Sequence, residues 1–253
     1  MTIQRMQLEA ELTRLLQPQL FRDYCPNGLQ VQGKNEINKL VTGVTASAAL
    51  IESAVDAGAD CLLVHHGYFW KGEDQNITGL KKTRVEKLLA SQLNLFAYHL
   101  PLDMHEEFGN NAELGRLLGF QFEASIGRPG DLEIVFMGKL AQPITLEALS
   151  AQIDTSLQRA PLCIGDPGQE LRRVAWCTGA AQSYFDVAIA AGVDAFITGE
   201  ISEPSAHLAR ESGVAFISAG HHATERYGVQ AVGNYLAEQF GLEHQFIDID
   251  NPA

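Results

Sequence analysis

The stretch VTGVTASAALIESAVDAGADCLLVHHG (41–67) decides the fold, because it places an amphipathic segment between two apolar runs. Residues 39–44 read as a strand, and Ser47 can cap a helix with apolar side chains at helical spacing. Residues 61–64 read as the next strand. A strand, a helix and another strand in this order predict an α/β architecture, with helices packed on a largely parallel sheet.

A second stretch, VAWCTGAAQSYFDVAIAAGVDAFITGE (174–200), reads in the same way: strand, small-residue turn, helix, Ala-Gly-x-Asp, strand. Gly58 and Asp60 correspond to Gly192 and Asp194, 134 positions further on in both cases. The repeat predicts two interlinked lobes of related topology, with mostly parallel sheets flanked by helices. We place the first lobe at residues 1–123 and the second at 124–253.

The bulk composition is that of an ordinary globular protein that handles small molecules. The net charge of −13 argues against a basic nucleic-acid footprint. Charged residues interrupt the N-terminal segment, which excludes a signal peptide, and no apolar run reaches the length of a membrane span. The four cysteines form no CxxC pair and read as reduced core thiols. We therefore expect a cytoplasmic protein with no membrane contact.

The adjacent residues His65 and His66 raise a specific problem at the end of an apolar run. Side chains in a strand alternate between faces, so neighbouring histidines should point apart. If both serve one purpose, the chain must leave strand geometry there, and Gly67 makes such a bend inexpensive. The alternative is one buried and one exposed histidine without a shared role.

Histidine, aspartate or glutamate follows four of the predicted strands, at residues 61–64, 95–98, 194–198 and 214–218. Ligands of open α/β sheets bind beyond the carboxyl ends of the strands, so these positions are informative. The side chains at these ends are His65, His66, His99, Asp103, Glu200, His221, His222 and Glu225. Five of the eight histidines therefore fall within a few residues of strand ends.

The residues His221 and Glu225 stand four apart at the expected start of a helix, where they share one face. An imidazole and a carboxylate on one face suit a metal ion. As an alternative, Glu225 is a first-turn carboxylate favoured by the helix dipole. His222 projects differently and is the weaker candidate.

The proposed ligands His65, His66, Asp103, His221 and Glu225 comprise three imidazoles and two carboxylates, without a thiolate. This set suits Zn, Fe, Mn, Co or Ni. Structural zinc usually takes four closed ligands, often with cysteine. Five ligands from two lobes predict instead two divalent metal ions between the lobes, bridged by a carboxylate, which can make a shared water nucleophilic.

Other polar and aromatic residues allow more than one interpretation. We expect His99 to act in catalysis as a proton-transfer group or to support the ligands, with a core histidine as the alternative. Tyr68, Phe69 and Trp70 either wall the pocket or pack, and Glu200 either belongs to the site or lies on the surface. The remaining histidines (His105, His207 and His244) read as surface or packing residues. No phosphate loop, nucleophile elbow or GxGxxG after a strand is present.

Several motifs together resemble the NIF-three-like family, and especially its short bacterial members. The motifs are YCPNGLQVQG (24–33), GVTAS (43–47), VHHGYFWKG (64–72), HLPLD (99–103), GNNAELGRLLG (109–119), DAFITGE (194–200) and AGHHATERYG (219–228). The likeness continues to the closing FIDIDNPA (246–253).

The resemblance implies a dinuclear metal centre with the same five ligands and a toroidal homohexamer. Family members are often labelled GTP cyclohydrolase 1 type 2 homologs and are linked to handling damaged nucleotides after DNA damage. Together with the strand-end residues, this favours a metal-dependent hydrolase acting on a small nucleotide-like substrate. The alternative is a non-catalytic metal-binding ring or a scaffold for a protein partner.

Overall fold

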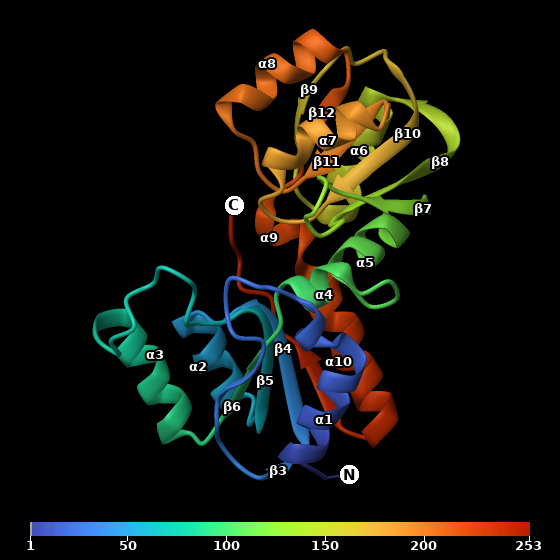
Figure 1. Cartoon of the computed structure of the whole chain (residues 1–253). Coiled ribbons are helices and arrows are strands. Elements are labelled where there is room, and N and C mark those ends of the chain that lie inside the picture. Colours follow the sequence, from blue (N-terminus) through green and yellow to red (C-terminus); the bar gives the residue numbers. More distant parts are fainter. Residues whose placement is uncertain (1) are drawn as a thin grey trace. The chain divides into compact units, whose positions relative to one another are not determined.

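The computed structural model describes residues 2–253, which divide into two compact units. Unit 1 runs to Gly109 and takes in Arg226–Asp250, and unit 2 comprises Asn110–Glu225 and Asn251–Ala253. Each unit is a sheet flanked by helices, as expected of an α/β protein (Figure 1).

The division between the units differs from the expected boundary at 123/124. The chain enters unit 2 at Asn110 because helix α5 (Asn110–Leu117) belongs to that unit, where a Cβ at Gly115 would lie 2.7 Å from the ring of Trp176. Later the chain returns, and helix α10 (Arg226–Phe240) joins unit 1. Unit 1 is therefore discontinuous in sequence.

The main sheet of unit 1 has five strands, four of which are mutually parallel. Its order is β13 (Glu243–Phe246), β4 (Lys39–Thr45), β5 (Cys61–His66), β6 (Asn94–Ala97) and β2 (Gly28–Val31). Only β2 is antiparallel to its neighbour in this sheet. A separate small pair joins β1 (Ile3–Gln4) and β3 (Glu36–Ile37).

Helices cover both faces of the unit 1 sheet (Figure 1). Helices α1 (Arg5–Leu16) and α10 pack on one face against Leu63, whereas α2 (Ala48–Asp56) and α3 (Gly79–Ala90) pack on the other against Leu62 and Val64. Ser47 caps α2 as expected, because its side chain accepts from the Leu50 amide. The alternation along β5 fixes the faces of the residues that follow Val64.

The sheet of unit 2 has six strands, and three of its five pairs are antiparallel. Its order is β7 (Phe120–Ile126), β8 (Val135–Thr145), β10 (Glu170–Cys177), β11 (Ala195–Thr198), β12 (Ala215–Ser218) and β9 (Leu162–Ile164). The expectation of mostly parallel sheets therefore holds for unit 1 and is wrong for unit 2. The difference arises because β7, β8 and β9 flank the three parallel strands β10, β11 and β12.

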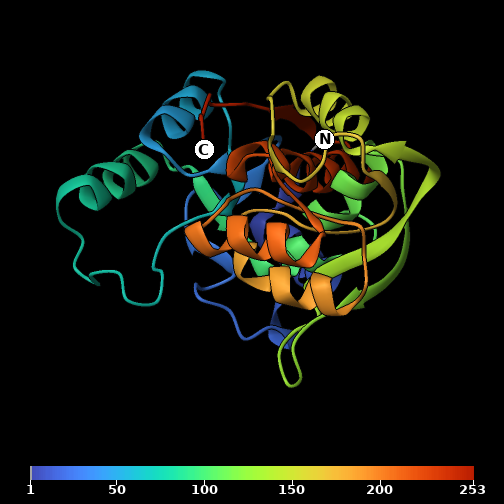
Figure 2. The same cartoon turned by 90° about the horizontal axis from the view of Figure 1, so that it is seen from above.

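The helices of unit 2 also include short ones. Its further helices are α6 (Leu146–Leu157), η2 (Gln182–Tyr184), α7 (Phe185–Ala190), α8 (Glu203–Ser212) and α9 (His221–Thr224). Helices α7 and α8 run side by side (Figure 2), and the rings of Phe185, Phe196 and Phe216 pack against one another in the core beneath α7. Among residues 2–253, no helix has both the length and the apolar character that a membrane crossing requires.

The residues Asp60 and Asp194 play the same part in their two units. One carboxylate oxygen of Asp60 accepts from the amides of Asn38 and Lys39, at 3.0 and 3.1 Å. The carboxylate of Asp194 accepts in the same way from two consecutive amides (Arg172 and Arg173, at 2.7 and 2.8 Å). Each aspartate thus ties the beginning of one parallel strand to the beginning of the next.

Candidate functional site

Strand β5 continues through both adjacent histidines before it ends. His65 follows the alternation and is fully buried, whereas His66 is half-buried. The expected departure from strand geometry is therefore wrong, and yet the ring centroids lie 4.4 Å apart. Gly67 is needed for space, since a Cβ there would lie 2.2 Å from Gln30 Oε1 and 2.6 Å from the Ala97 Cβ.

The imidazole of His65 is fixed by the main chain. Its Nδ1 atom lies 2.9 Å from the carbonyl oxygen of Tyr98, which can only accept, so Nδ1 carries a hydrogen. Its Nε2 atom lies 3.4 Å from Oδ1 of Asp103, on helix α4 (Leu100–Met104). This arrangement presents a nitrogen lone pair and a carboxylate at nearly the same point.

Two further histidines join His65 at this edge of the unit 1 sheet. One nitrogen each of His65, His66 and His99 lie within 4.8 Å of one another. Nδ1 of His66 lies 3.1 Å from the hydroxyl of Thr45, which can orient the ring. We call His65, His66, His99 and Asp103 the unit 1 cluster.

The side chain of His99 is oriented by Asp23, a residue that the sequence analysis missed. Nδ1 of His99 lies 2.7 Å from Oδ1 of Asp23, and the main-chain amide of His99 donates to Asn27 Oδ1 at 2.7 Å. Asp23 lies in the loop between η1 (Pro18–Leu20) and β2, 76 positions before His99. No strand end precedes it, and the neighbouring motif YCPNGLQVQG (24–33) was the one signal available.

Burial alone would raise the pKa of Asp23, but hydrogen bonds from His99, Asn27 and the Tyr24 amide outweigh it and hold the pKa below its usual value. The nearby Cys25 behaves differently. Burial, together with the charges of Asp23 and Asp103, raises the pKa of its thiol to about 12. Cys25 therefore stays protonated at neutral pH where no cation lies beside it.

Two of the aromatic residues lie against His99. The ring of Trp70 meets it edge to face at 4.9 Å, and the ring of Tyr24, which is 60% exposed, does so at 6.5 Å. Trp70 therefore belongs to the wall of the unit 1 cluster, as one of the two sequence interpretations held. Tyr68 packs instead, because it is buried and its hydroxyl donates to the Ala46 carbonyl.

In unit 2, His221 lies between two carboxylates. Its Nδ1 atom is 2.7 Å from Oε1 of Glu200, and its Nε2 atom is 3.2 Å from Oε2 of Glu225. Helix α9 ends at Thr224, one residue before Glu225, so the expected longer helix is interrupted. The turn is still long enough to bring His221 and Glu225 together. We call Glu200, His221 and Glu225 the unit 2 cluster.

The two carboxylates control the proton affinity of His221. Burial would lower its pKa, but the hydrogen bonds and negative charges of Glu225 and Glu200 outweigh burial and raise the pKa to about 9. Glu200 is thus a member of the cluster, and its side chain is also 41% exposed, so both sequence interpretations describe part of its position. Its position directly after β11 was the signal that could have given it more weight.

Glycines hold the backbone of unit 2 close to this cluster. A Cβ at Gly179, where φ is +67°, would lie 2.1 Å from Oε1 of Glu225. The Gly179 amide donates to the hydroxyl of Thr224 at 3.1 Å. A Cβ at Gly199 would lie 2.6 Å from the Cα of His221. The main chain therefore forms a cradle that fixes where the Glu225 carboxylate and the His221 ring lie.

The other histidines have local roles. His222 is buried, and its amide donates to the carbonyl of Ala253. His105 accepts from the amides of Glu107 and Phe108, and His207 is an exposed partner of Glu203. His244 lies between Thr42 and Asn234. The interpretation of His105, His207 and His244 as packing or surface residues agrees with these contacts.

The four cysteines are all thiols, as expected from their spacing. Cys61 and Cys177 are buried in their strands, and burial raises the pKa of the Cys61 thiol strongly. A small apolar side chain is therefore their role in the core.

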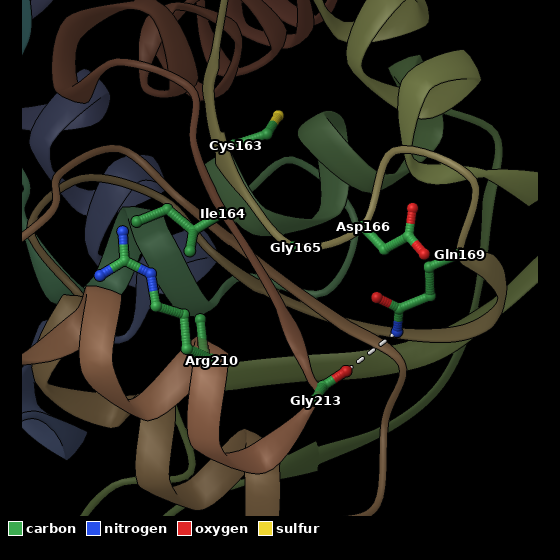
Figure 3. A pocket seen from close by; sticks show the side chains of 8 residues that line it. Cys163, Ile164, Gly165, Asp166, Gln169, Arg210 and Gly213 are labelled. Atoms are coloured by element: carbon green, nitrogen blue, oxygen red, sulfur yellow. Dashed lines mark hydrogen bonds between the residues drawn. The ribbon is translucent and has the colours of Figure 1, made fainter.

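A cavity of about 730 Å³ lies within unit 2 but contains no member of either cluster (Figure 3). Cys163, Asp166 and Arg210 line it, together with Gln169, whose amide donates to the carbonyl of Gly213. The residues that line this cavity are therefore different from the residues of the two clusters.

The donor chemistry of both clusters fits a divalent cation. In each cluster an imidazole Nε2 and a carboxylate oxygen approach within 3.2–3.4 Å, and each needs a cation or a proton between its lone pairs. In each, an oxygen atom holds Nδ1 of the same ring, which is the usual support for a metal-binding histidine. Imidazole and carboxylate ligands suit transition metals of borderline softness.

Comparison with known proteins gives relatives over the full length of the chain. A protein of Pseudomonas aeruginosa, named GTP cyclohydrolase 1 type 2 homolog, is 53% identical over 253 residues, which is 100% of both chains. A protein of Vibrio cholerae with the same name is 52% identical over 251 residues, covering 98% of this chain and 99% of the relative.

Solved structures agree with these relatives. The protein ybgI, described as of unknown function, is 49% identical with a TM-score of 0.95, covering 99% of this chain and 100% of that one. A protein of Thermus thermophilus is 32% identical with a TM-score of 0.89 and the same coverage. The model of Duf34/NIF3 (NGG1p interacting factor 3) matches residues 3–252. The chain therefore belongs to the Duf34/NIF3 family.

Proposed function

We propose that the protein binds two divalent metal ions through His65, His66, Asp103, His221 and Glu225, and that it hydrolyses a small, nucleotide-like substrate. The observation that carries the proposal is the matched construction of the two clusters. Each has an imidazole with Nδ1 held by oxygen and Nε2 directed at a carboxylate.

The ligand set supports Zn, Fe, Mn, Co or Ni without choosing among them. When bound, such ions polarise the group under attack and make water acidic enough to act as a nucleophile at neutral pH. The protein's own residues would bind the ions and transfer the proton. His65 and His221 present Nε2, Asp103 and Glu225 supply negative charge, and His99 accepts and returns a proton.

The nucleotide-like substrate rests on the relatives. The proteins of Pseudomonas aeruginosa and Vibrio cholerae carry the name GTP cyclohydrolase 1 type 2 homolog, which indicates hydrolysis in a purine nucleotide. The exposed ring of Tyr24 beside His99 offers a surface on which a planar base could stack. A role in handling damaged nucleotides and assembly as a cytoplasmic homohexamer extend the same proposal.

A duplicated origin would account for the matched strands at the centres of the two sheets. The bonds of Asp60 and Asp194 correspond at the same offset, and the register of β4 on β5 corresponds to that of β10 on β11. We infer that the two sheets share an origin, in which the position of His66 at the end of β5 corresponds to that of Glu200 after β11.

The test begins with protein purified without chelators or a nickel column. Its metals are measured by mass spectrometry, and it is offered nucleotides, phosphoesters and cyclic amides. We expect about two ions per chain and turnover of at least one substrate. The variant His65→Ala should lose both, whereas His207→Ala, which removes an exposed histidine on α8, should lose neither.

Turnover that survives in His65→Ala would overturn the hydrolase. If no substrate reacts while His65→Ala loses its metal and its assembly by light scattering, the non-catalytic ring or scaffold is the correct function.

A further inference from the structure

The carboxylate of Asp23 is buried beside the unit 1 cluster and accepts four hydrogen bonds. Its side chain is 3% exposed. Oδ1 accepts from the Tyr24 amide at 2.6 Å and from His99 Nδ1 at 2.7 Å, and Oδ2 accepts from Asn27 Nδ2 at 2.8 Å and from the Leu100 amide at 2.9 Å. Four donors therefore compensate the cost of burying this charge.

These contacts determine which nitrogen of His99 carries the hydrogen. A carboxylate only accepts, so Nδ1 of His99 must be the donor, and the neutral ring keeps its lone pair on Nε2. The main chain of His99 is held as well, by the bond from its amide to Asn27 Oδ1. The orientation of the imidazole is thus set from two directions by one loop.

The His99 ring is partly exposed and lies beside the two histidines of β5. Its side chain is 17% exposed, and its ring centroid lies 5.1 Å from that of His65 and 5.9 Å from that of His66. Trp70 meets the ring edge to face at 4.9 Å and restricts its rotation. The contacts of Asp23 therefore orient the His99 ring in addition to stabilising the loop.

We propose that Asp23 is a positioning residue that holds His99 in the Nδ1–H tautomer, so that Nε2 can accept a proton from the water that attacks the substrate. This inference rests on the proposed hydrolytic function. The O–H bond of the water breaks, its proton goes to Nε2, and its oxygen forms a bond to the electrophilic atom of the substrate.

The second half of the step returns the protein to its starting state. The bond from the electrophilic atom to the leaving group breaks, and Nε2–H of the imidazolium gives its proton to the leaving atom. Asp23 remains ionised and stabilises the imidazolium meanwhile, as a buried carboxylate does for the histidine of hydrolytic triads.

The tautomer can be measured directly. We would record ¹⁵N imidazole spectra of the zinc-loaded protein and assign His99 by the signals lost in His99→Gln. The wild type should show Nδ1 protonated and Nε2 as the acceptor. In Asp23→Asn the amide can donate to Nδ1, which should move the hydrogen to Nε2. The matched control is Asp60→Asn, which weakens another carboxylate that accepts main-chain amides in unit 1 but touches no histidine.

Metal content and turnover complete the test. Asp23→Asn should keep its zinc, because Asp23 is not among the five proposed ligands. Its kcat should fall about 10²–10⁴-fold with KM nearly unchanged, the range that proton transfer contributes. Asp60→Asn should change unfolding but neither the tautomer nor kcat.

The outcomes separate this inference from the function on which it rests. An Nε2–H tautomer in the wild type, which needs no variant to fold, overturns the positioning role, and so does an unchanged tautomer in folded Asp23→Asn. Asp23→Asn could show a changed tautomer and yet keep the wild-type kcat, while His65→Ala is inactive. That result would overturn the role of His99 in proton transfer and would leave the hydrolytic function standing. If no substrate turns over in any variant, the hydrolase fails, and the tautomer still decides whether Asp23 positions His99.

Discussion

The imidazole of His221 donates from Nδ1 to Oε1 of Glu200 across 2.7 Å. The two residues follow different strands, β12 and β11, and meet where those parallel strands end. A carboxylate on Nδ1 fixes the tautomer of a histidine and raises the basicity of Nε2, the atom that faces Glu225. His221 thus has the geometry of a metal ligand, and Glu200 that of the carboxylate that orients it.

Replacing Glu200 by glutamine should weaken metal binding without abolishing it. The amide keeps the shape of the side chain but loses the charge that favours Nδ1–H on His221. We expect the affinity to fall by about 10–100-fold, the usual effect of losing such a support. Competition with a fluorescent chelator measures it. Glu203→Gln, at an exposed position on α8, is the control, and equal affinities in the two variants would show that Glu200 has no such role.

Metal binding should weaken as the pH falls below about 9. Burial lowers the pKa of His221, but Glu225 and Glu200 raise it more, to about 9, so a proton competes with the metal at neutral pH. Below that pH the affinity should fall by up to about tenfold per unit for this one proton. Calorimetry in buffers of different ionisation enthalpy would detect the proton released on binding. His221→Gln should release less, and equal release in both proteins would contradict the assignment.

The same shift has a consequence for stability in protein treated with a chelator. The folded-state pKa of His221 lies above the unfolded value near 6.5. Its contribution to stability is therefore complete below pH 6.5 and is lost as the pH rises through 9. Urea unfolding at about pH 6 and about pH 9.5 should show this loss in the wild type, and His221→Gln should show less of it.

Exchanging Gly179 for alanine should displace a proposed ligand. The new Cβ would lie 2.1 Å from Oε1 of Glu225, and a φ of +67° disfavours any side chain. We expect loss of metal together with a destabilisation of about 1–2 kcal/mol from the backbone. The matched control is Gly192→Ala, which has a φ of +68° and no atom near its Cβ. It should lose similar stability but no metal, so metal lost equally from both would point to the backbone alone.

Much of the fold and of the site could be predicted because both depend on local patterns. The apolar runs before His65 and His221 end as strands, and the residues after them gather at strand ends. Periodicity and strand-end position both act over a few residues, so one sequence is enough to find them.

The remaining features depend on contacts between distant segments. Asp23 meets His99 across 76 positions from a loop without periodicity, and α10 returns to unit 1 after a long excursion. The antiparallel edges of unit 2 likewise come from residues outside the repeated stretch. The tautomer of His65 is set by a carbonyl oxygen, at Tyr98, which every residue carries and no sequence pattern marks.

Removing the carboxylate of Asp60 or of Asp194 should destabilise the protein by similar amounts. Each accepts from two consecutive main-chain amides, and leaving such donors unsatisfied costs about 1–3 kcal/mol. Asp60→Ala should lose more at low salt, because Asp60 also pairs with Lys34 at 2.8 Å. Urea unfolding at two salt concentrations measures both effects, with Asp56→Ala, at an exposed position of α2, as the control. A loss confined to one of the two variants would contradict equivalent roles, because the same pair of bonds would then matter in one unit and not in the other.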